Sequence, residues 1–231
     1  MTQIKLGEIT VDVVRKDIKN IHLSVYPPTG RVRISAPSRI KLETIRVYAV
    51  SKLGWIKKQQ EKLRSQERET PRDYITRESH YFMGKRYLLK ITETDATQTV
   101  VLRHREIELV VKKGADLKQK QKLLEDWYRK RLRQSAGKYI AFWEKQMNLK
   151  VAEFGIKRMR TKWGSCNREA KRIWLNLELA KKPKECLEYI VVHEMVHVLE
   201  RNHGTRFVAL MDQFLPQWRQ YKDELNRLPV G

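Results

Sequence analysis

The chain has 231 residues, of which 41% are apolar, enough for a hydrophobic core in one large domain or two small ones. It has no run of 18 apolar residues, which argues against a transmembrane helix, and its N-terminus lacks the apolar stretch of a signal peptide. Cys166 and Cys186 are the only cysteines, so we expect a reduced, cytoplasmic protein without membrane contact. Lysine and arginine number 49 against 27 acidic residues, and a net charge of +22 attracts nucleic acid or other polyanions.

Apolar periodicity divides the first part of the chain into strands and one helix. Alternation over residues 9–36 predicts strands, with a turn at 27–30. From Leu42 to about residue 66 the apolar residues recur at spacings of three and four, which predicts a helix. Four further strands are predicted between Tyr81 and Val111. We therefore expect a strand-rich N-terminal part with one long helix over residues 1–115.

The second part of the chain, residues 116–231, is predicted to hold most of the helices. A long helix is expected from about Leu117 to Leu149, and a strand pair over residues 154–180, whose second strand runs from Ile173 to Leu179. A further helix is expected over residues 184–200, and two shorter ones follow it. The predicted fold class is α+β.

The sequence His193-Glu194-Met195-Val196-His197 lies in the middle of the helix predicted over residues 184–200. Positions i and i+4 share one face of a helix, so both imidazoles can reach a single zinc ion. Glu194 points about 100° around the helix, which suits a general base that touches water without binding the metal. The helix is apolar on nearly every side, and buried polar groups need partners. The pattern therefore predicts one zinc ion per chain.

Catalytic zinc usually has three protein ligands, and His203 completes the spacing H-E-x-x-H-x-x-E-x-x-H. The alternative third ligands are Glu200, Asp212 and Glu224. We expect Glu200 to support a ligating histidine through its carboxylate instead. Glu200 stands where metzincins have glycine, so Asn202 or Gly204 is expected to make the turn that leaves the helix.

Several segments together resemble the YgjP-like metallopeptidases, which are kin of the SprT-like proteases. They are Thr161-Lys162-Trp163-Gly164-Ser165-Cys166, Ile173-Trp174-Leu175-Asn176, Val191 to His197, Asn202 to Phe207 and Leu215-Pro216-Gln217-Trp218. The resemblance implies that residues 116–231 form a zincin-like metallopeptidase domain, which contains an active-site helix. It also implies a protein or peptide substrate. In zincins a strand beside that helix receives the peptide by edge pairing. By position, the strand with Trp174 and Asn176 would be that edge. Cys166 is expected to be a small buried residue in a tight turn rather than a nucleophile or a ligand.

The mechanism expected from these residues is attack of a metal-activated water on the scissile carbonyl, with Glu194 transferring the proton. A second hydrogen-bond donor normally helps to stabilise the developing oxyanion, and the candidates, which the sequence does not rank, are Tyr189, Arg206 and Lys162.

A basic segment precedes the predicted substrate strand and leaves two alternatives open. Lys157, Arg158, Arg160 and Lys162 belong to it, and we expect them to bind a polyanion. A basic rim at a metal centre also suits a nucleotide or phosphoester hydrolase that uses the same site. The third hypothesis is a nucleic-acid-binding module with a structural metal, although structural zinc sites are closed and mostly cysteine-rich.

Overall fold

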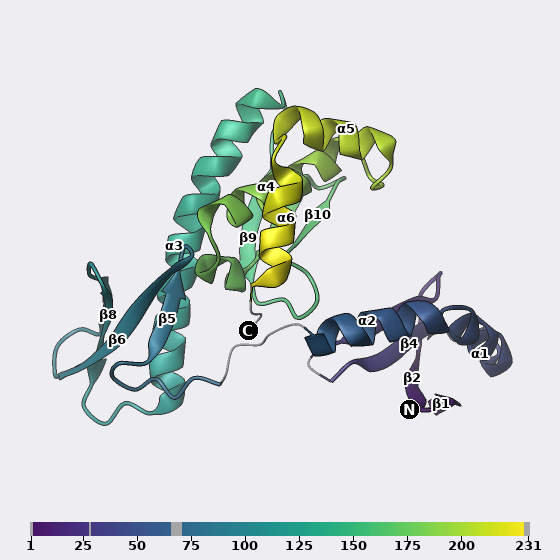
Figure 1. The fold of residues 1–231 in the computed structure, drawn as a ribbon, viewed down its shortest axis with the longest axis horizontal. Coiled ribbons are helices and arrows are strands. Elements are labelled where there is room, and N and C mark those ends of the chain that lie inside the picture. Colours follow the sequence, from purple (N-terminus) through teal and green to yellow (C-terminus); the bar gives the residue numbers. More distant parts are fainter. Residues whose placement is uncertain (1, 28, 66–70, 229–231) are drawn as a thin grey trace. The chain divides into compact units, whose positions relative to one another are not determined.

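The computed structural model describes residues 2–27, 29–65 and 71–228. The chain divides into two compact units, Met1–Arg68 and Glu69–Gly231. Both combine strands with helices, so the predicted α+β class is confirmed (Figure 1). No helix in the described ranges combines the length and the apolar character needed to cross a membrane.

The N-terminal unit is a four-stranded sheet with two helices. Its strands are in the order β1-β2-β4-β3, in which β2 and β4 run parallel and the other neighbours run antiparallel. The elements are β1 (Thr2–Leu6), β2 (Ile9–Lys16), β3 (His22–Tyr26), β4 (Arg31–Pro37), α1 (Leu42–Ser51) and α2 (Leu53–Ser65).

The core of this unit lies between one face of the sheet and the two helices. Ile45 and Ala49 from α1 and Ile56 from α2 are fully buried there with the inward side chains of all four strands. The predicted single helix is interrupted at Lys52, close to Gly54, whose low helix propensity favours a break. The predicted end of that helix at residue 66 lies outside the described residues.

The C-terminal unit contains two sheets and the remaining helices. One sheet has the order β5-β6-β8-β7 and the other the order β10-β11-β9. The elements are β5 (Ser79–Phe82), β6 (Lys85–Thr94), β7 (Thr99–Leu102), β8 (Glu106–Lys112), α3 (Leu117–Gln146), β9 (Glu153–Lys157), β10 (Gly164–Asn167), β11 (Arg172–Asn176), the 3-10 helix η1 (Leu177–Lys181), α4 (Lys184–Leu199), α5 (Thr205–Phe214) and α6 (Trp218–Arg227).

The long helix α3 joins both sheets into one core (Figure 1). It begins at a capping box, in which the Asp116 carboxylate accepts a hydrogen bond from the Gln119 backbone N–H and the Gln119 side chain accepts one from the backbone of Asp116. Leu124 and Trp127 of α3 share a core with Leu89 of β6 and with the helix α4.

The expected division between residues 115 and 116 therefore differs from the compact units. The β5–β8 sheet belongs with the helices that follow it, because its apolar face is buried in the same core. The turn between β5 and β6 reinforces this arrangement. The backbone N–H groups of Met83 and Gly84 donate to the carbonyls of Ala180 and Lys181, at 2.9 and 3.2 Å.

Candidate metal centre

Helix α4 carries the candidate ligands and lies at the centre of the C-terminal unit. It contacts α3, α5, α6, β10 and β11. Such a position requires apolar residues on nearly every side, and Leu187, Val191, Val192, Met195 and Val196 are fully buried. The helix therefore holds His193, Glu194 and His197 on a rigid, closely packed support.

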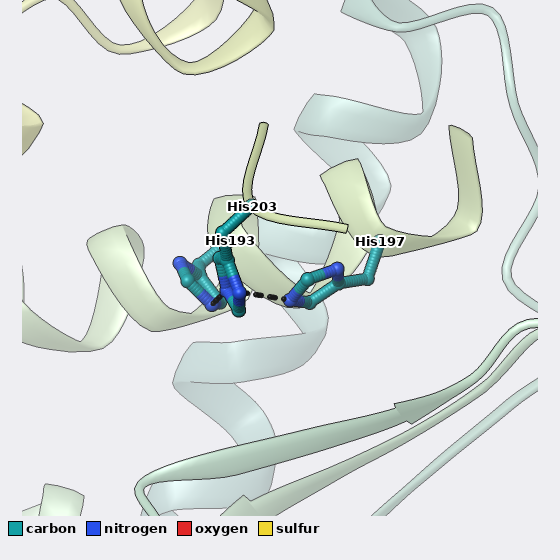
Figure 2. Close-up of side chains that lie close together, drawn as sticks. All are labelled: His193, His197 and His203. Carbon is teal, nitrogen blue, oxygen red and sulfur yellow. Dashed lines mark hydrogen bonds between the residues drawn. The ribbon is translucent and has the colours of Figure 1, made fainter. Parts of the chain in front are cut away.

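Three imidazoles converge on one point (Figure 2). His193 and His197 come from adjacent turns of α4, and His203 reaches back from the loop between α4 and α5. The Nε2 atom of His203 lies 3.1 Å from the Nε2 atoms of both His193 and His197. All three predicted ligands thus meet, with a candidate ligand atom on each.

These distances fit a tetrahedral metal ion. With metal–nitrogen bonds of about 2.0–2.1 Å, two nitrogens at the corners of a tetrahedron are about 3.3–3.4 Å apart. The observed 3.1 Å is close to that separation. Three imidazoles can supply the protein ligands of a catalytic zinc site, which keeps its fourth position for water or substrate.

The two helical histidines are held in the protonation state that a metal ligand needs. Burial, together with the neighbouring His197 and His203, lowers the pKa of His193 to about 3. Burial also lowers the pKa of His197. The Nδ1 atom of His197 lies 3.1 Å from the backbone carbonyl of Glu200 and donates to it, which leaves Nε2 free to bind a metal. His193 Nδ1 is buried and finds no partner in the described part of the chain.

Glu200 supports His197 through its backbone rather than through the predicted carboxylate. The Glu200 side chain accepts a hydrogen bond from the Asn202 backbone N–H at 3.2 Å and lies 3.8 Å from Arg206 Nε. These contacts hold the loop that presents His203. The helix ends in an extended Glu200, at φ −135°, and neither Asn202 nor Gly204 has a positive φ. The expected left-handed turn is therefore absent.

Glu194 lies beside the three histidines and is buried against β10. A Cβ atom at Gly164 would come within 2.4 Å of its Oε1 atom, so the carboxylate occupies the space that the missing side chain leaves. Burial raises the pKa of Glu194 to about 8, and the charge of Lys162 acts in the opposite direction. A carboxyl group with a raised pKa in a cleft is typical of general acid–base catalysis.

A cleft of about 1090 Å³ opens over the histidines and Glu194. One wall is β10 with its flanking residues, 161–169, and the other comes from α4 and the loop that follows. Lys162, Arg168 and Arg201 give the lining a basic character.

Strand β10 borders this cleft, and the prediction that β11 is the edge strand beside the active-site helix is wrong. Strand β11 is the central strand of its sheet, paired with β10 on one side and β9 on the other, so it has no free edge. Trp174 packs on Gly155 of β9. Asn176 is buried, and its amide exchanges hydrogen bonds with the backbone of Met159 and Lys162. Both residues thus support the cleft wall without lining the cleft.

The segment beyond Asn176 does not continue the strand. The Asn176 side chain accepts a hydrogen bond from the Glu178 backbone N–H and begins the 3-10 helix η1. The strand predicted to Leu179 therefore ends at Asn176.

The predicted basic cluster is spread over several contacts. Arg158 pairs with Glu125 and Glu178, at 3.0 and 3.3 Å, and Lys157 lies over the Trp174 ring. Arg160 and Lys162 are exposed, and only Lys162 lines the cleft. The charge of Arg158 is thus shared with two carboxylates, and binding of a polyanion by the four residues stays a prediction.

The remaining candidates occupy different places. Asp212 accepts hydrogen bonds from Trp218 Nε1 and Arg219, and Glu224 lies near Cys186 Sγ, so neither approaches the histidines. Of the suggested oxyanion donors, Tyr189 and Lys162 line the cleft, whereas Arg206 does not. Cys166 is half-buried in strand β10 and lines the cleft, so the expected burial in a tight turn is wrong. Burial, with the nearby Glu194, raises the pKa of the Cys166 thiol to about 11, so the thiol stays protonated.

Sequence patterns placed Arg168 only in a basic run and did not predict that it connects the β10–β11 hairpin to α4. Its guanidinium donates to the backbone carbonyls of Val198 and Leu199, at 3.1 and 3.4 Å. A cation at the C-terminal end of α4 also compensates the helix dipole. Only an excess of basic residues near the strand pair pointed to this region.

A buried carboxylate beside three converging imidazoles defines a candidate centre for metal-dependent hydrolysis. The family model "YgjP-like, metallopeptidase domain" matches residues 19–228, and the chain belongs to this YgjP-like family. No curated protein matched the chain.

Two solved structures resemble part of the chain. The metallopeptidase zymogen abylysin of Pyrococcus abyssi has a TM-score of 0.37 at 14% identity, over 39% of this chain and 90% of that one. The metallopeptidase zymogen jannalysin of Methanocaldococcus jannaschii has a TM-score of 0.34 at 20% identity, over 41% of this chain and 92% of that one.

Proposed function

We propose that the protein is a zinc-dependent peptidase that holds one zinc ion through His193, His197 and His203. The observation that carries this proposal is the convergence of the three Nε2 atoms beside the buried carboxylate of Glu194. Membership of a metallopeptidase family supports peptide bonds as the substrate.

Glu194 is the proposed general base and acid. Bound zinc would supply Lewis acidity, which polarises a carbonyl group and makes water easier to deprotonate. The Glu194 carboxylate would take the proton from the attacking water and return it to the leaving amine. Gly164 on one side and the packed helix on the other keep this carboxylate in place.

The exposed edge of β10 is the proposed binding site for the substrate backbone. Among the described strands, β10 pairs only with β11, so its other edge has free hydrogen-bonding groups. An extended peptide in the cleft could add to the sheet there and bring a scissile carbonyl to the metal centre. Because main-chain pairing requires no particular side chain, sequence preference would come from the rest of the cleft lining.

Tyr189 is the proposed second donor to the oxyanion. The centroid of its ring lies 5.8 Å from the centroid of the His193 ring, and Tyr189 lines the cleft. Burial raises the pKa of Tyr189 to about 12, so its hydroxyl remains protonated and can donate at neutral pH.

Hydrolysis by the metal-loaded protein tests this function. We would offer a denatured protein, short neutral peptides and a nucleoside triphosphate, each to wild type and to Glu194→Gln. We expect peptide cleavage, lowered about 10²–10⁴-fold by the substitution while the metal content is unchanged. Cleavage of the triphosphate alone would favour a phosphoester hydrolase, and equal activity of the variant would refute the role of Glu194.

A further inference from the structure

The sheet of the N-terminal unit has a second face, opposite the two helices. Ile4, Val11, Val13, Val32 and Ile34 point into the core, so their neighbours along each strand point the other way. The strand register places twelve side chains on this open face: Gln3, Lys5, Thr10, Asp12, Val14, Lys16, His22, Ser24, Tyr26, Arg31, Arg33 and Ser35. All but Asp12 are exposed or half-buried.

The charge on this face is predominantly positive. Lys5, Lys16, Arg31 and Arg33 stand against the single acid Asp12. The Asp12 carboxylate is already engaged, because it accepts hydrogen bonds from Gln3 and Arg31. The whole unit Met1–Arg68 has 15 lysine and arginine residues against six acidic ones. A polyanion would therefore meet an attractive field from this unit.

Arg33 and Tyr26 form a distinctive pair on the open face. The Arg33 guanidinium lies over the Tyr26 ring, 5.4 Å from its centroid. Arg33 Nε is buried and has no hydrogen-bond partner within the described ranges. An unsatisfied buried donor is unfavourable unless an acceptor reaches the group, and a phosphate or a base edge would supply acceptors. Arg33 is the cross-strand neighbour of Asp12, and its charge acts on that carboxylate, but its Nε donor remains unsatisfied and would be satisfied by a ligand.

We propose that the open face of the N-terminal sheet binds single-stranded nucleic acid. The cationic side chains would neutralise phosphates, and the Tyr26 ring would provide a surface on which an unpaired base stacks. Four-stranded sheets with exposed aromatic residues stack about two or three bases in this manner. A single strand fits better than a duplex, because a duplex keeps its bases stacked on one another. This inference does not depend on the proposed peptidase function.

Fluorescence anisotropy with the full chain and labelled 20-nucleotide DNA and RNA strands, at ~50 mM salt, tests the proposal. Lys5→Gln with Arg33→Gln removes two charges from the open face. Arg46→Gln with Lys58→Gln is the matched control, since it removes one arginine and one lysine from exposed positions on α1 and α2. Tyr26→Leu removes the ring and keeps an apolar side chain. Thermal unfolding of each variant identifies any that fails to fold. Arg33→Lys, which keeps the charge, gives a second test of the guanidinium.

We expect the open-face pair to weaken binding at least about tenfold and to reduce the salt slope by about 1.4. The control pair should change affinity less than about threefold. Tyr26→Leu should weaken binding about tenfold through lost stacking. Equal effects of the two charge pairs, or no binding by wild type, would overturn the proposal. The proposal would also be overturned if binding were lost on substitution of Arg160 and Lys162 by glutamate but kept in the open-face variants. Equal competition by polyglutamate or by duplex DNA would mean that the face attracts acidic surfaces or duplexes instead.

Discussion

Adding one methyl group at Gly164 would displace the proposed base without removing it. Gly164 is in β10, and its φ is not positive, so the backbone accepts alanine. The new Cβ would lie 2.4 Å from Glu194 Oε1, 2.7 Å from Cγ and 2.8 Å from Cδ. All three atoms belong to a flexible side chain, so the carboxylate would move and the fold would remain.

The size of the effect follows from this displacement. Ordinary contacts of a Cβ atom begin at 3.4 Å, and the nearest one here is 2.4 Å, so the carboxylate has to move by about 1 Å. A misplacement of about 1 Å at a reacting centre lowers a rate about 10²-fold, which corresponds to about 2.7 kcal/mol of activation free energy. Gly164→Ala should therefore approach the effect of losing the base.

The assay compares kcat/KM and metal content for wild type, Gly164→Ala, Glu194→Gln and the double variant. Gly164→Ala should keep its zinc, because it does not touch the histidines. In the double variant, Gly164→Ala should lower kcat/KM by less than about threefold relative to Glu194→Gln alone, because the carboxylate that it displaces is already absent. Full activity of Gly164→Ala, or additive losses in the double variant, would refute this account of how Glu194 is positioned.

Three further predictions concern the metal, the cleft wall and pH. His203→Ala should lose most of its zinc on dialysis, because two histidines leave the ion under-coordinated; a full metal content would exclude His203 as a ligand. Asn176→Ala should lower the free energy of unfolding by about 3 kcal/mol, because the backbone partners of the buried amide lose their hydrogen bonds. Calorimetry should then show an unfolding temperature lowered by about 6–12 °C. Burial lowers the pKa of His80, so the unfolded chain binds a proton more readily. The free energy of unfolding should then rise with pH through about 6.5. Because the lowered pKa values of His193 and His197 contribute to the same rise, His80→Gln should make it less steep without abolishing it.

The convergence of the three candidate ligands could be predicted because their geometry is local. His193 and His197 are one helical turn apart, and the apolar residues around them predicted a buried helix, which α4 confirms. His203 follows within six residues, so its approach requires only a short loop. The helix α3 and the strands β5–β8 also lie where the apolar periodicity predicts them, although α3 ends at Gln146 rather than at Leu149.

The pairing of distant segments could not be predicted in the same way. Strand β11 alternates as an edge strand would, and only the parallel partner β9 makes it central. Arg158 belongs to a basic run, yet its partner Glu125 is 33 positions earlier, on α3. Gly164 precedes Glu194 by 30 residues, and nothing in the spacing shows that one leaves room for the other.

The shared core of the C-terminal unit determines how the peptidase could be transferred between proteins. Leu89, Ile107 and Leu109 are buried with α3 and α4, so a fragment that begins at residue 116 would expose that side of α3 to water. Such a fragment should aggregate, whereas one that begins at residue 71 keeps both sheets. Gene fusion or recombination would therefore have to move Glu69–Gly231 as a single block. The N-terminal unit, with its own core, could be exchanged separately.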